Sequence, residues 1–297
     1  MGPTATGKSE LALALAADLR GEVVNADAMQ LYRGLDIGTA KLTPTERAGV
    51  PHHLLDVLDV TEVASVAAYQ RAAREVVERL RAAGRTPVLV GGSGLYVQAV
   101  IDELEFPGTD PELRAGLQAE LASCGPEAMH ARLAEVDPAA AEVVLPTNGR
   151  RIVRALEVIA LTGRPFPARL PSGGAARYDA VLLGVDRDTA DLDARVARRV
   201  ARMFAAGLVE ETRELLAQGL REGLTASRAL GYQQVVAALD GVGDLGTAAA
   251  ATVTATRRFV RRQRSWFRRD PRIQWLDGAA PDLLVRARAV TSRAVSF

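Results

Sequence analysis

The segment GPTATGKS, residues 2–9, constrains the fold of this 297-residue chain more than any other stretch. It fits the pattern G-x-x-x-x-G-K-S, in which glycines let the backbone curl so that successive N–H groups point at an anion. Lys8 would place a positive charge on the outer phosphate oxygens, and the hydroxyl of Ser9 could ligate Mg²⁺. Residues 9–19 have helical spacing without proline, so a helix should follow and add its positive N-terminal end. The pattern predicts a phosphate-binding loop, although a chance glycine-rich turn would share it.

A loop of this kind normally follows a buried strand. Here only Met1 precedes Gly2, where we expect about five apolar residues. We therefore expect the first strand to be missing from this chain. The corresponding position in the sheet should be empty or open, and the loop should be less ordered than in a sheet that has this strand.

Strand and helix patterns alternate in the first third of the chain. EVVNAD, residues 22–27, and TPVLVGG, residues 86–92, are runs typical of short strands. Residues 65–84 between them have the period of an amphipathic helix that ends at Gly84. This alternation predicts an α/β core with a mostly parallel sheet flanked by helices.

The pattern changes near Phe106. From there to about Arg169 it is helical with proline punctuation, and AVLLGVD, residues 180–186, has the character of a returning strand. We therefore predict a phosphate-loop core over residues 1–106 and 180–297, with a helical insertion domain over residues 107–179.

Composition limits the partners and the compartment. The formal net charge is +1, so any basic site must be local. The single cysteine excludes a framework of disulfides within the chain, and the three histidines show no metal-ligand spacing. No apolar run approaches the ~20 residues of a membrane span, and no charged and then apolar leader precedes the loop. We expect a cytoplasmic monomer that does not enter a membrane.

Two polar residues stand at expected strand ends. Asp27 closes VVNAD and Ser93 follows TPVLVGG, so both should lie at the carboxyl edge of the sheet, where ligands bind in such folds. The run AMQLYRGLDIGTAK that follows Asp27 could line a pocket. An Asp at this position is also a common helix cap, and a Ser between glycines is also a common turn residue. The pattern alone leaves these alternatives open.

The segment RRFVRRQRSWFRR, residues 257–269, holds seven arginines in thirteen residues. At helical periodicity one stripe contains Arg257, Arg261, Arg264 and Arg268, and the apolar residues fall on the opposite side. Arginine binds phosphate oxygens through its planar fork and stacks on exposed bases. The segment therefore predicts an RNA-binding helix. A salt-bridged, solvated face is the alternative, but few acids lie within one turn to pair these arginines.

A series of segments resembles, in this order, the motifs of the tRNA dimethylallyltransferases, also called tRNA isopentenyltransferases. The segments are GPTATGKS, NADAMQLYRGLDIGTAK, PHHLLD, LVGGSGLY, NGRRIVRALEV, RVARRVARMFAAGL, SRALGYQQ and TRRFVRRQRSWFRRDPRIQWLD. The resemblance runs from Gly2 to about Asp277. The departures are the absent first strand and the tail from Gly278.

The resemblance implies transfer of a dimethylallyl group from dimethylallyl diphosphate to N6 of adenosine 37 in tRNA, with release of diphosphate. Asp27 matches the family's general base, and Ser93 and Lys8 are the other catalytic candidates. Mg²⁺, held through Ser9, would accompany the diphosphate. The residues implied to bind the diphosphate are Gly2, Pro3, Thr4, Ala5, Thr6, Gly7, Lys8, Ser9 and Arg199.

The resemblance also implies contacts with the tRNA anticodon stem-loop from the strand ends, the insertion and the arginine-rich helix. The implied residues are Asp27, Ala28, Met29, Gln30, Ser93, Arg150, Arg151, Arg154, Arg228, Gly231, Tyr232, Arg261, Arg262, Gln263, Arg264, Trp266 and Arg268. The target adenine would leave its stack to reach Asp27.

The residues by themselves leave two other functions open. An ATP-dependent small-molecule kinase uses the same phosphate loop, and a non-catalytic RNA-binding protein could carry the same arginines. Against the kinase, we identify no apolar run that ends in the metal-holding Asp typical of such enzymes, and no motif for a purine base. The resemblance favours a prenyl diphosphate as the ligand of the loop.

Overall fold

The computed structural model describes residues 1–167 and 176–295, with side chains up to residue 292. The chain forms two compact units, of which the larger joins Met1–Asp102 to Ala175–Phe297 and the smaller is Glu103–Gly174. The range predicted for the insertion includes residues outside the described part, and its boundaries stay a prediction. Within the described residues no helix has the length and apolar character needed to cross a membrane.

The larger unit contains two parallel sheets. The first has the order β2-β1-β3, with β1 (Glu22–Asn25) in the centre, β2 (His52–His53) on one side and β3 (Pro87–Val90) on the other. The second pairs β4 (Leu183–Asp186) with β5 (Gln274–Asp277). The predicted mostly parallel α/β core is therefore confirmed.

Strands β1, β3 and β4 form where their apolar runs predicted them, whereas β2 and β5 were not predicted. His52 and His53 pair in parallel with Val23 and Val24 of β1. Two residues are too few to show an alternating pattern. Strand β5 is mostly exposed, so its sequence lacks the apolar run of a buried strand.

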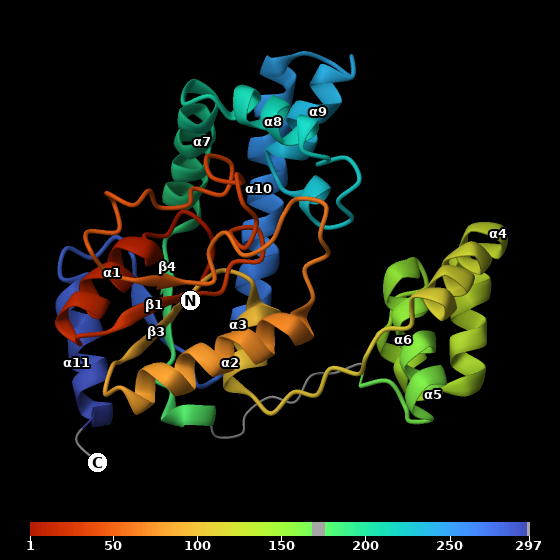
Figure 1. The fold of residues 1–297 in the computed structure, drawn as a ribbon, viewed down its shortest axis with the longest axis horizontal. Helices are drawn as coiled ribbons and strands as arrows, with labels where there is room; N and C mark the ends of the chain where they lie inside the picture. The colour runs from red at the N-terminus through yellow and green to blue at the C-terminus, as the bar shows by residue number, and fades with distance from the viewer. Residues whose placement is uncertain (168–175, 296–297) are drawn as a thin grey trace. The chain divides into compact units, whose positions relative to one another are not determined.

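Helices surround the first sheet. Strands β1 and β3 lie between α1 (Lys8–Asp18) and α2 (Val66–Ala82), and both helices contact them (Figure 1). Helix α2 begins at its predicted amphipathic segment and buries Tyr69, Ala73, Val76, Val77 and Leu80. Helix α3 (Gly94–Ile101) follows β3 and packs on α2, and α11 (Leu283–Val295) packs on α1.

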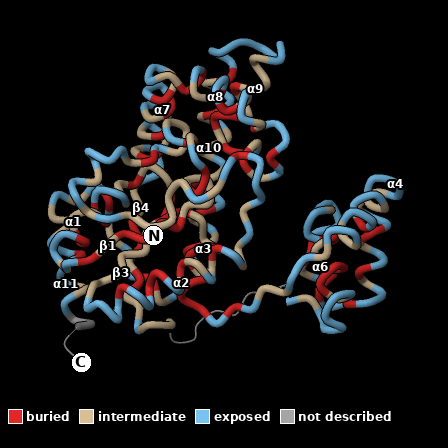
Figure 2. The backbone as a smooth tube through the Cα atoms, in the orientation of Figure 1, coloured by how far each residue is buried: buried red, intermediate tan, exposed pale blue. Residues whose placement is uncertain are grey.

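A second group of helices lies between β4 and β5 in the sequence. It comprises α7 (Thr189–Ala205), α8 (Leu208–Ala217), η2 (Ala226–Arg228), α9 (Tyr232–Leu239) and α10 (Leu245–Phe267); the short helix η1 (Arg177–Asp179) precedes β4. Helix α10 contacts α3, α7 and α9. It thus reaches from α3, which follows β3, to the cluster of α7 and α9. Its buried residues are Ala248, Thr252, Val260, Gln263 and Phe267, and Figure 2 colours the buried parts of the chain red.

The smaller unit is helical, as its sequence pattern indicated. It consists of α4 (Pro111–Val136), α5 (Pro138–Val143) and α6 (Gly149–Thr162) around a core of its own. Asp110 caps α4 by accepting hydrogen bonds from Glu112 N and Leu113 N. Pro126 and the non-helical Gly125 divide α4 into two straight parts.

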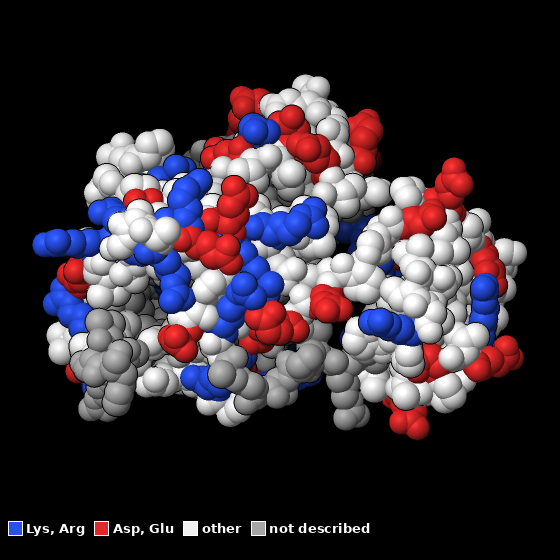
Figure 3. Space-filling model, turned by 60° about the horizontal axis from the view of Figure 1, so that its bottom comes forward, with Lys and Arg blue, Asp and Glu red and all other residues white. Residues whose placement is uncertain are grey.

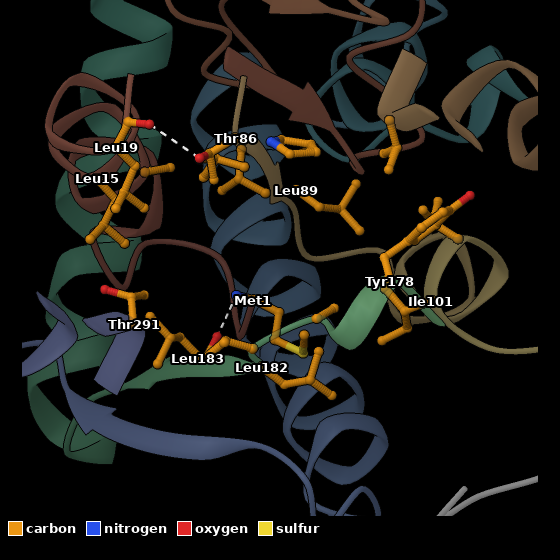
Figure 4. Close-up of a pocket in the computed structure, with 18 of the residues that line it drawn as sticks. Met1, Leu15, Leu19, Thr86, Leu89, Ile101, Tyr178, Leu182, Leu183 and Thr291 are labelled. Carbon is orange, nitrogen blue, oxygen red and sulfur yellow. Dashed lines mark hydrogen bonds between the residues drawn. The ribbon is translucent and has the colours of Figure 1, made fainter. Parts of the chain in front are cut away.

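A cavity of about 470 Å³ separates β3 from β4, and residues of both strands line it. Leu15, Leu19, Leu89 and Leu182 are among its apolar lining residues (Figure 4). At one end, Met1 N donates to Leu183 O at 2.7 Å, and Met1 O accepts from Val185 N at 2.9 Å. This is the hydrogen-bond pattern of a residue in a strand parallel to β4. Met1 therefore lies beside β4, at the position expected for the strand before the loop and next to this cavity.

Because the cavity is apolar and has β3 and β4 on two sides, it should accept a strand built onto the chain. We predict that five residues Val-Val-Ile-Val-Val placed before Met1 raise the thermal unfolding midpoint by about 5–10 °C, because a net gain of about 2–3 kcal/mol remains once the entropy lost by ordering these residues is subtracted from their burial. Circular dichroism measures the midpoint, with a Ser-Gly-Ser-Gly-Ser extension as the control. Equal midpoints for the two extensions would contradict the geometry.

Candidate active site

The backbone of residues 2–9 turns tightly, and α1 begins within this loop at Lys8. Gly2 has φ 132° and approaches β4 so closely that a Cβ atom would lie 2.3 Å from Val185 O. Gly7, which precedes α1, has φ 99°, and Ala5 has φ 65°. These left-handed residues curl the chain tightly at the helix N-terminus.

Basic side chains hold the loop by its carbonyl groups. Lys8 Nζ donates to Pro3 O. Arg195 Nε donates to Ala5 O at 2.8 Å, and Arg187 Nε donates to Thr6 O at 3.2 Å. Within the described residues no acceptor is recorded for the backbone N–H groups of Gly7, Lys8 and Ser9. The carbonyl oxygens are therefore engaged and these amides remain available to an anion.

Gln263 of α10 ties the loop to the end of β3. Its side-chain oxygen accepts from Thr4 N at 3.0 Å, and its side-chain nitrogen donates to Gly92 O at 2.9 Å. Gln263 is only 5% exposed. The family resemblance implied an RNA contact here, but the structure gives this side chain an internal role, because it joins the phosphate loop to the residue beside Ser93.

Lys8, Arg199 and Asp27 act on one another electrostatically. Burial and, to a smaller extent, the positive charge of Arg199 lower the pKa of the Lys8 ammonium to about 7, although Asp27 and Asp186 act in the opposite direction. Burial also lowers the pKa of Arg199, and the Asp27 carboxylate again acts in the opposite direction. Such mutual effects require proximity, so the loop, α7 and the end of β1 contribute charges to one neighbourhood.

Asp27 is half-buried directly after β1, and no ion pair is recorded for it in the described part of the chain. Its Oδ1 accepts from Met29 N at 3.0 Å, while its own N–H donates to Asn25 Oδ1 at 2.9 Å. Ser93 Oγ accepts from Ala28 N at 3.1 Å. The carboxylate thus makes a local turn contact rather than the helix cap of the alternative interpretation, and its second oxygen remains available.

Ser9 lies at the start of α1 with an exposed side chain. It lines a small cavity together with Asn25 and Gln30, which connects the loop to the end of β1. In the described residues no group of three or more His, Cys, Asp and Glu could enclose a metal ion. The ligand that the chain could offer a cation here is therefore the Ser9 hydroxyl, which lies beside the amides of the loop. This suits Mg²⁺, because this ion often takes most of its ligands from water and phosphate.

Asp186 was not predicted as a site residue, although AVLLGVD is an apolar run that ends in it. It closes β4, and its charge raises the pKa of Lys8. Both carboxylate oxygens of Asp186 accept from Arg264 Nε at 3.0 Å. A run of apolar residues that ends in an acid was the available signal. In this structure the acid is committed to Arg264.

Helix α10 divides its arginines between internal and exposed positions. Arg264, 12% exposed, donates to Arg187 O at 2.5 Å in addition to Asp186, and Arg257 lies 3.5 Å from Asp193. Arg261 and Arg262 are exposed, and no ion pair is recorded for either among the described residues. The acids that pair Arg257 and Arg264 come from β4 and α7, which explains why no partner was found within one turn of α10.

The other residues implied to bind RNA also differ in exposure. Trp266 packs so closely on Gly94 that a Cβ there would lie 2.2 Å from the indole Cδ1. Gly231 and Tyr232 are buried, whereas Arg228 is exposed. On the face drawn in Figure 3, Lys and Arg side chains lie among Asp and Glu side chains, as the small net charge implied.

In the smaller unit, Arg150 and Arg151 are exposed at the start of α6. Arg154 instead donates to the fully buried Glu157 at 2.7 Å and to Pro107 O at 2.7 Å. Arg114 donates to the same carboxylate at 2.5 Å. Arg154 therefore stabilises the start of this unit, because an unpaired Glu157 would be a costly buried charge.

The pKa of Lys8 gives the anion site a specific pH dependence. With a pKa of about 7, Lys8 is mostly charged at pH 6 and mostly neutral at pH 8. We predict that its contribution makes the protein bind inorganic diphosphate about tenfold more weakly at pH 8 than at pH 6. Titration calorimetry measures both constants, and Lys8→Arg, which stays charged, is the control for the protonation of diphosphate itself. The same pH ratio in both proteins would contradict the assignment.

Comparison with known proteins agrees with this geometry. The sequence pattern of the IPP transferase family matches residues 30–270. The tRNA dimethylallyltransferase of Saccharopolyspora erythraea is 68% identical over 290 residues, which cover 98% of this chain and 94% of that protein. The corresponding protein of Streptomyces avermitilis is 66% identical over 283 residues, 95% of this chain and 90% of that one.

Solved structures show the same fold. The tRNA isopentenylpyrophosphate transferase of Bacillus halodurans has a TM-score of 0.73 and 38% identity, over 99% of this chain and 94% of that one. A eukaryotic dimethylallyltransferase solved acting on tRNA has a TM-score of 0.82 over 99% of this chain and 78% of that one, and at 24% identity it supports the fold alone. The sequence pattern and the close relatives together show that this chain belongs to the IPP transferase family.

Proposed function

We propose that this chain transfers a dimethylallyl group from dimethylallyl diphosphate to N6 of adenosine 37 in tRNA. The observation that carries the proposal is the mutual electrostatic effect of Lys8, Arg199 and Asp27. It brings two cations for a departing diphosphate and a carboxylate for a departing proton to one neighbourhood. A kinase could also use such a carboxylate as a base, and the close relatives, which are tRNA dimethylallyltransferases, favour the prenyl donor.

The diphosphate end of the site consists of the loop amides, Lys8 and Arg199. As the C–O bond of the donor breaks, negative charge develops on the diphosphate. Amides whose direction is already set by the bound carbonyl groups stabilise this charge without reorganising during the reaction. Arg199 adds a planar donor from α7, and Lys8 adds a point charge from the start of α1.

Asp27 is proposed as the general base. The adenine amino group is a weak nucleophile because its lone pair is delocalised into the ring. As the new C–N bond forms, N6 loses a proton, and the available oxygen of Asp27 accepts it, which contributes roughly 10²–10⁴-fold to the rate. Ser93 acts beside it, because its hydroxyl oxygen holds the N–H group of Ala28 and thereby fixes the residue after Asp27.

Ser9 is the proposed protein ligand of Mg²⁺, with diphosphate oxygens and water as the other ligands. When bound, this ion neutralises part of the charge on the leaving group. The exposed hydroxyl at the start of α1 fits this role, whereas the acid at the end of β4 is engaged by Arg264. The chain itself therefore supplies one hydroxyl group beside the loop amides.

For the tRNA, we propose the exposed arginines as phosphate contacts. These are Arg228, Arg261, Arg262 and Arg268 in the larger unit and Arg150 and Arg151 in the smaller one. A target base would leave its stack to reach Asp27, at a cost of about a few kcal/mol. We further propose that the chain acts as a monomer in the cytoplasm.

Replacing Asp27 tests the chemical step. In an assay with labelled dimethylallyl diphosphate, Mg²⁺ and unmodified tRNA, we predict that Asp27→Asn lowers kcat by about 10²–10⁴-fold, while KM for either substrate changes by about threefold at most. Asp59→Asn is the control, because Asp59 is an exposed acid whose recorded ion pair is with the exposed Arg33. An unchanged kcat in Asp27→Asn would remove the base, and ATP consumption without RNA would favour a kinase.

Arg261 and Arg264 should behave differently although they lie one turn apart. We predict that Arg261→Ala weakens tRNA binding and reduces the slope of log affinity against log salt by about 1, with little change in stability. Arg264→Ala should instead lower the free energy of unfolding by about 2–3 kcal/mol, because Asp186 loses its buried partner and keeps the exposed Arg268 at 3.4 Å. Filter binding at several salt concentrations and urea unfolding measure the two effects. If Arg264→Ala reduces the salt slope at full stability, the internal assignment of Arg264 is wrong.

A further inference from the structure

The segment between Asp36 and Lys41 has no regular secondary structure, yet polar contacts fix it at several points. Lys41, 8% exposed, donates to Tyr32 O at 2.8 Å and to Asp36 and Asp56 at 2.5 Å each. Ala40 N donates to Ile37 O at 3.0 Å and closes a turn. The segment is therefore a turn whose far end is anchored through Lys41.

Glu211 of α8 holds the first half of this turn. Its carboxylate accepts from Ile37 N at 2.9 and 3.1 Å and from Gly38 N at 3.4 Å. A carboxylate that accepts successive backbone N–H groups fixes the direction of the peptide plane between them. The acceptor is distant in sequence from the turn, so the α8 helix rather than local propensity sets this backbone.

Tyr232 of α9 contacts both Glu211 and the turn. Its hydroxyl donates to Glu211 Oε1 at 2.5 Å and accepts from Gly38 N at 3.1 Å. Gly38 lies so close to the ring that a Cβ would be 2.4 Å from Cε2. Burial and the adjacent carboxylate raise the pKa of Tyr232, so the hydroxyl stays protonated and donates. The side chain is fully buried, which leaves it no surface for RNA.

Thr39, the next residue of the turn, contacts Arg199 of the candidate active site. Thr39 O accepts from Arg199 Nη2 at 3.1 Å and from Gln30 Nε2 at 3.2 Å. In the described part of the chain this is the one hydrogen bond recorded for the Arg199 guanidinium. The direction of the Thr39 carbonyl therefore decides where Arg199 points.

We propose that Glu211 and Tyr232 are positioning residues that orient the Ile37–Thr39 backbone and, through the Thr39 carbonyl, fix the guanidinium of Arg199 at the diphosphate end of the site. The inference rests on the proposed function, because it takes Arg199 as a diphosphate ligand. Glu211 of α8 and Tyr232 of α9 then support the part of the site that binds the diphosphate of the prenyl donor, whereas the family resemblance implied that Tyr232 contacts tRNA.

The first experiment compares three substitutions that differ in their connection to the turn. Glu211→Gln removes the charged acceptor, Tyr232→Phe removes only the hydroxyl, and Glu214→Gln removes an exposed acid from the same helix as the control. Calorimetry with inorganic diphosphate and Mg²⁺, and separate binding of an anticodon stem-loop RNA, give the two affinities. We expect Glu211→Gln to weaken diphosphate binding about tenfold and Tyr232→Phe about threefold, with RNA affinity within twofold of the original.

A double-mutant cycle separates positioning from a general structural role. If Glu211 acts through Arg199, Glu211→Gln should weaken diphosphate binding by less than about twofold in an Arg199→Ala background. The same tenfold loss in that background would overturn the proposal. So would loss of RNA affinity alone in Tyr232→Phe, or an equal loss in Glu214→Gln. Tyr232→Phe keeps the ring and the fold, so the test does not depend on the stability of Glu211→Gln.

The outcomes also distinguish this inference from the proposed function. If the unaltered protein binds no diphosphate, or if Arg199→Ala leaves its affinity unchanged, the ligand assignment in the proposed function fails. If Arg199→Ala weakens diphosphate binding but neither Glu211→Gln nor Tyr232→Phe does, only the positioning inference fails.

Discussion

Three hydrogen bonds from Lys8, Arg187 and Arg195 to carbonyl oxygens of residues 2–9 are the interactions on which the rest of the site depends. They hold the loop from α1, α7 and the end of β4, and they leave the amides of the first turn of α1 for an anion. A loop free to rotate its peptide planes would lose this preorganisation. Gln263 adds a fourth tie, which fixes the distance between the loop and the residues around Ser93.

The arginines of this chain serve two purposes that the sequence does not separate. The side chains of Arg187, Arg195 and Arg264 bind acceptors within the protein and stabilise its structure. Arg261 and Arg262 on α10 remain exposed. The net charge of +1 therefore does not show that some arginines pair internally around residues 2–9 while others stay exposed and available to a polyanion.

Local patterns predicted the parts of the fold that depend on local physics. Glycine placement, periodicity and apolar runs predict the tight turn of residues 2–9 before α1, helix α2 with its Ser65 cap and the strands β1, β3 and β4. The partners of Arg264, Gln263 and Tyr232 could not be predicted, because each lies in a segment distant in sequence. Strand β2 was too short to show a period, and Asp186 was overlooked although its apolar run ends visibly in an acid.

The central claim is that the loop amides, Arg199 and Asp27 surround one cavity. A crystal structure of the protein with inorganic diphosphate and Mg²⁺ tests it most directly. The account predicts diphosphate oxygens within hydrogen-bond distance of the backbone N–H groups of Gly7 and Lys8 and of the Arg199 guanidinium, with the Asp27 carboxylate facing the same cavity. Diphosphate bound away from these amides, or Asp27 separated from it by packed protein, would contradict the account.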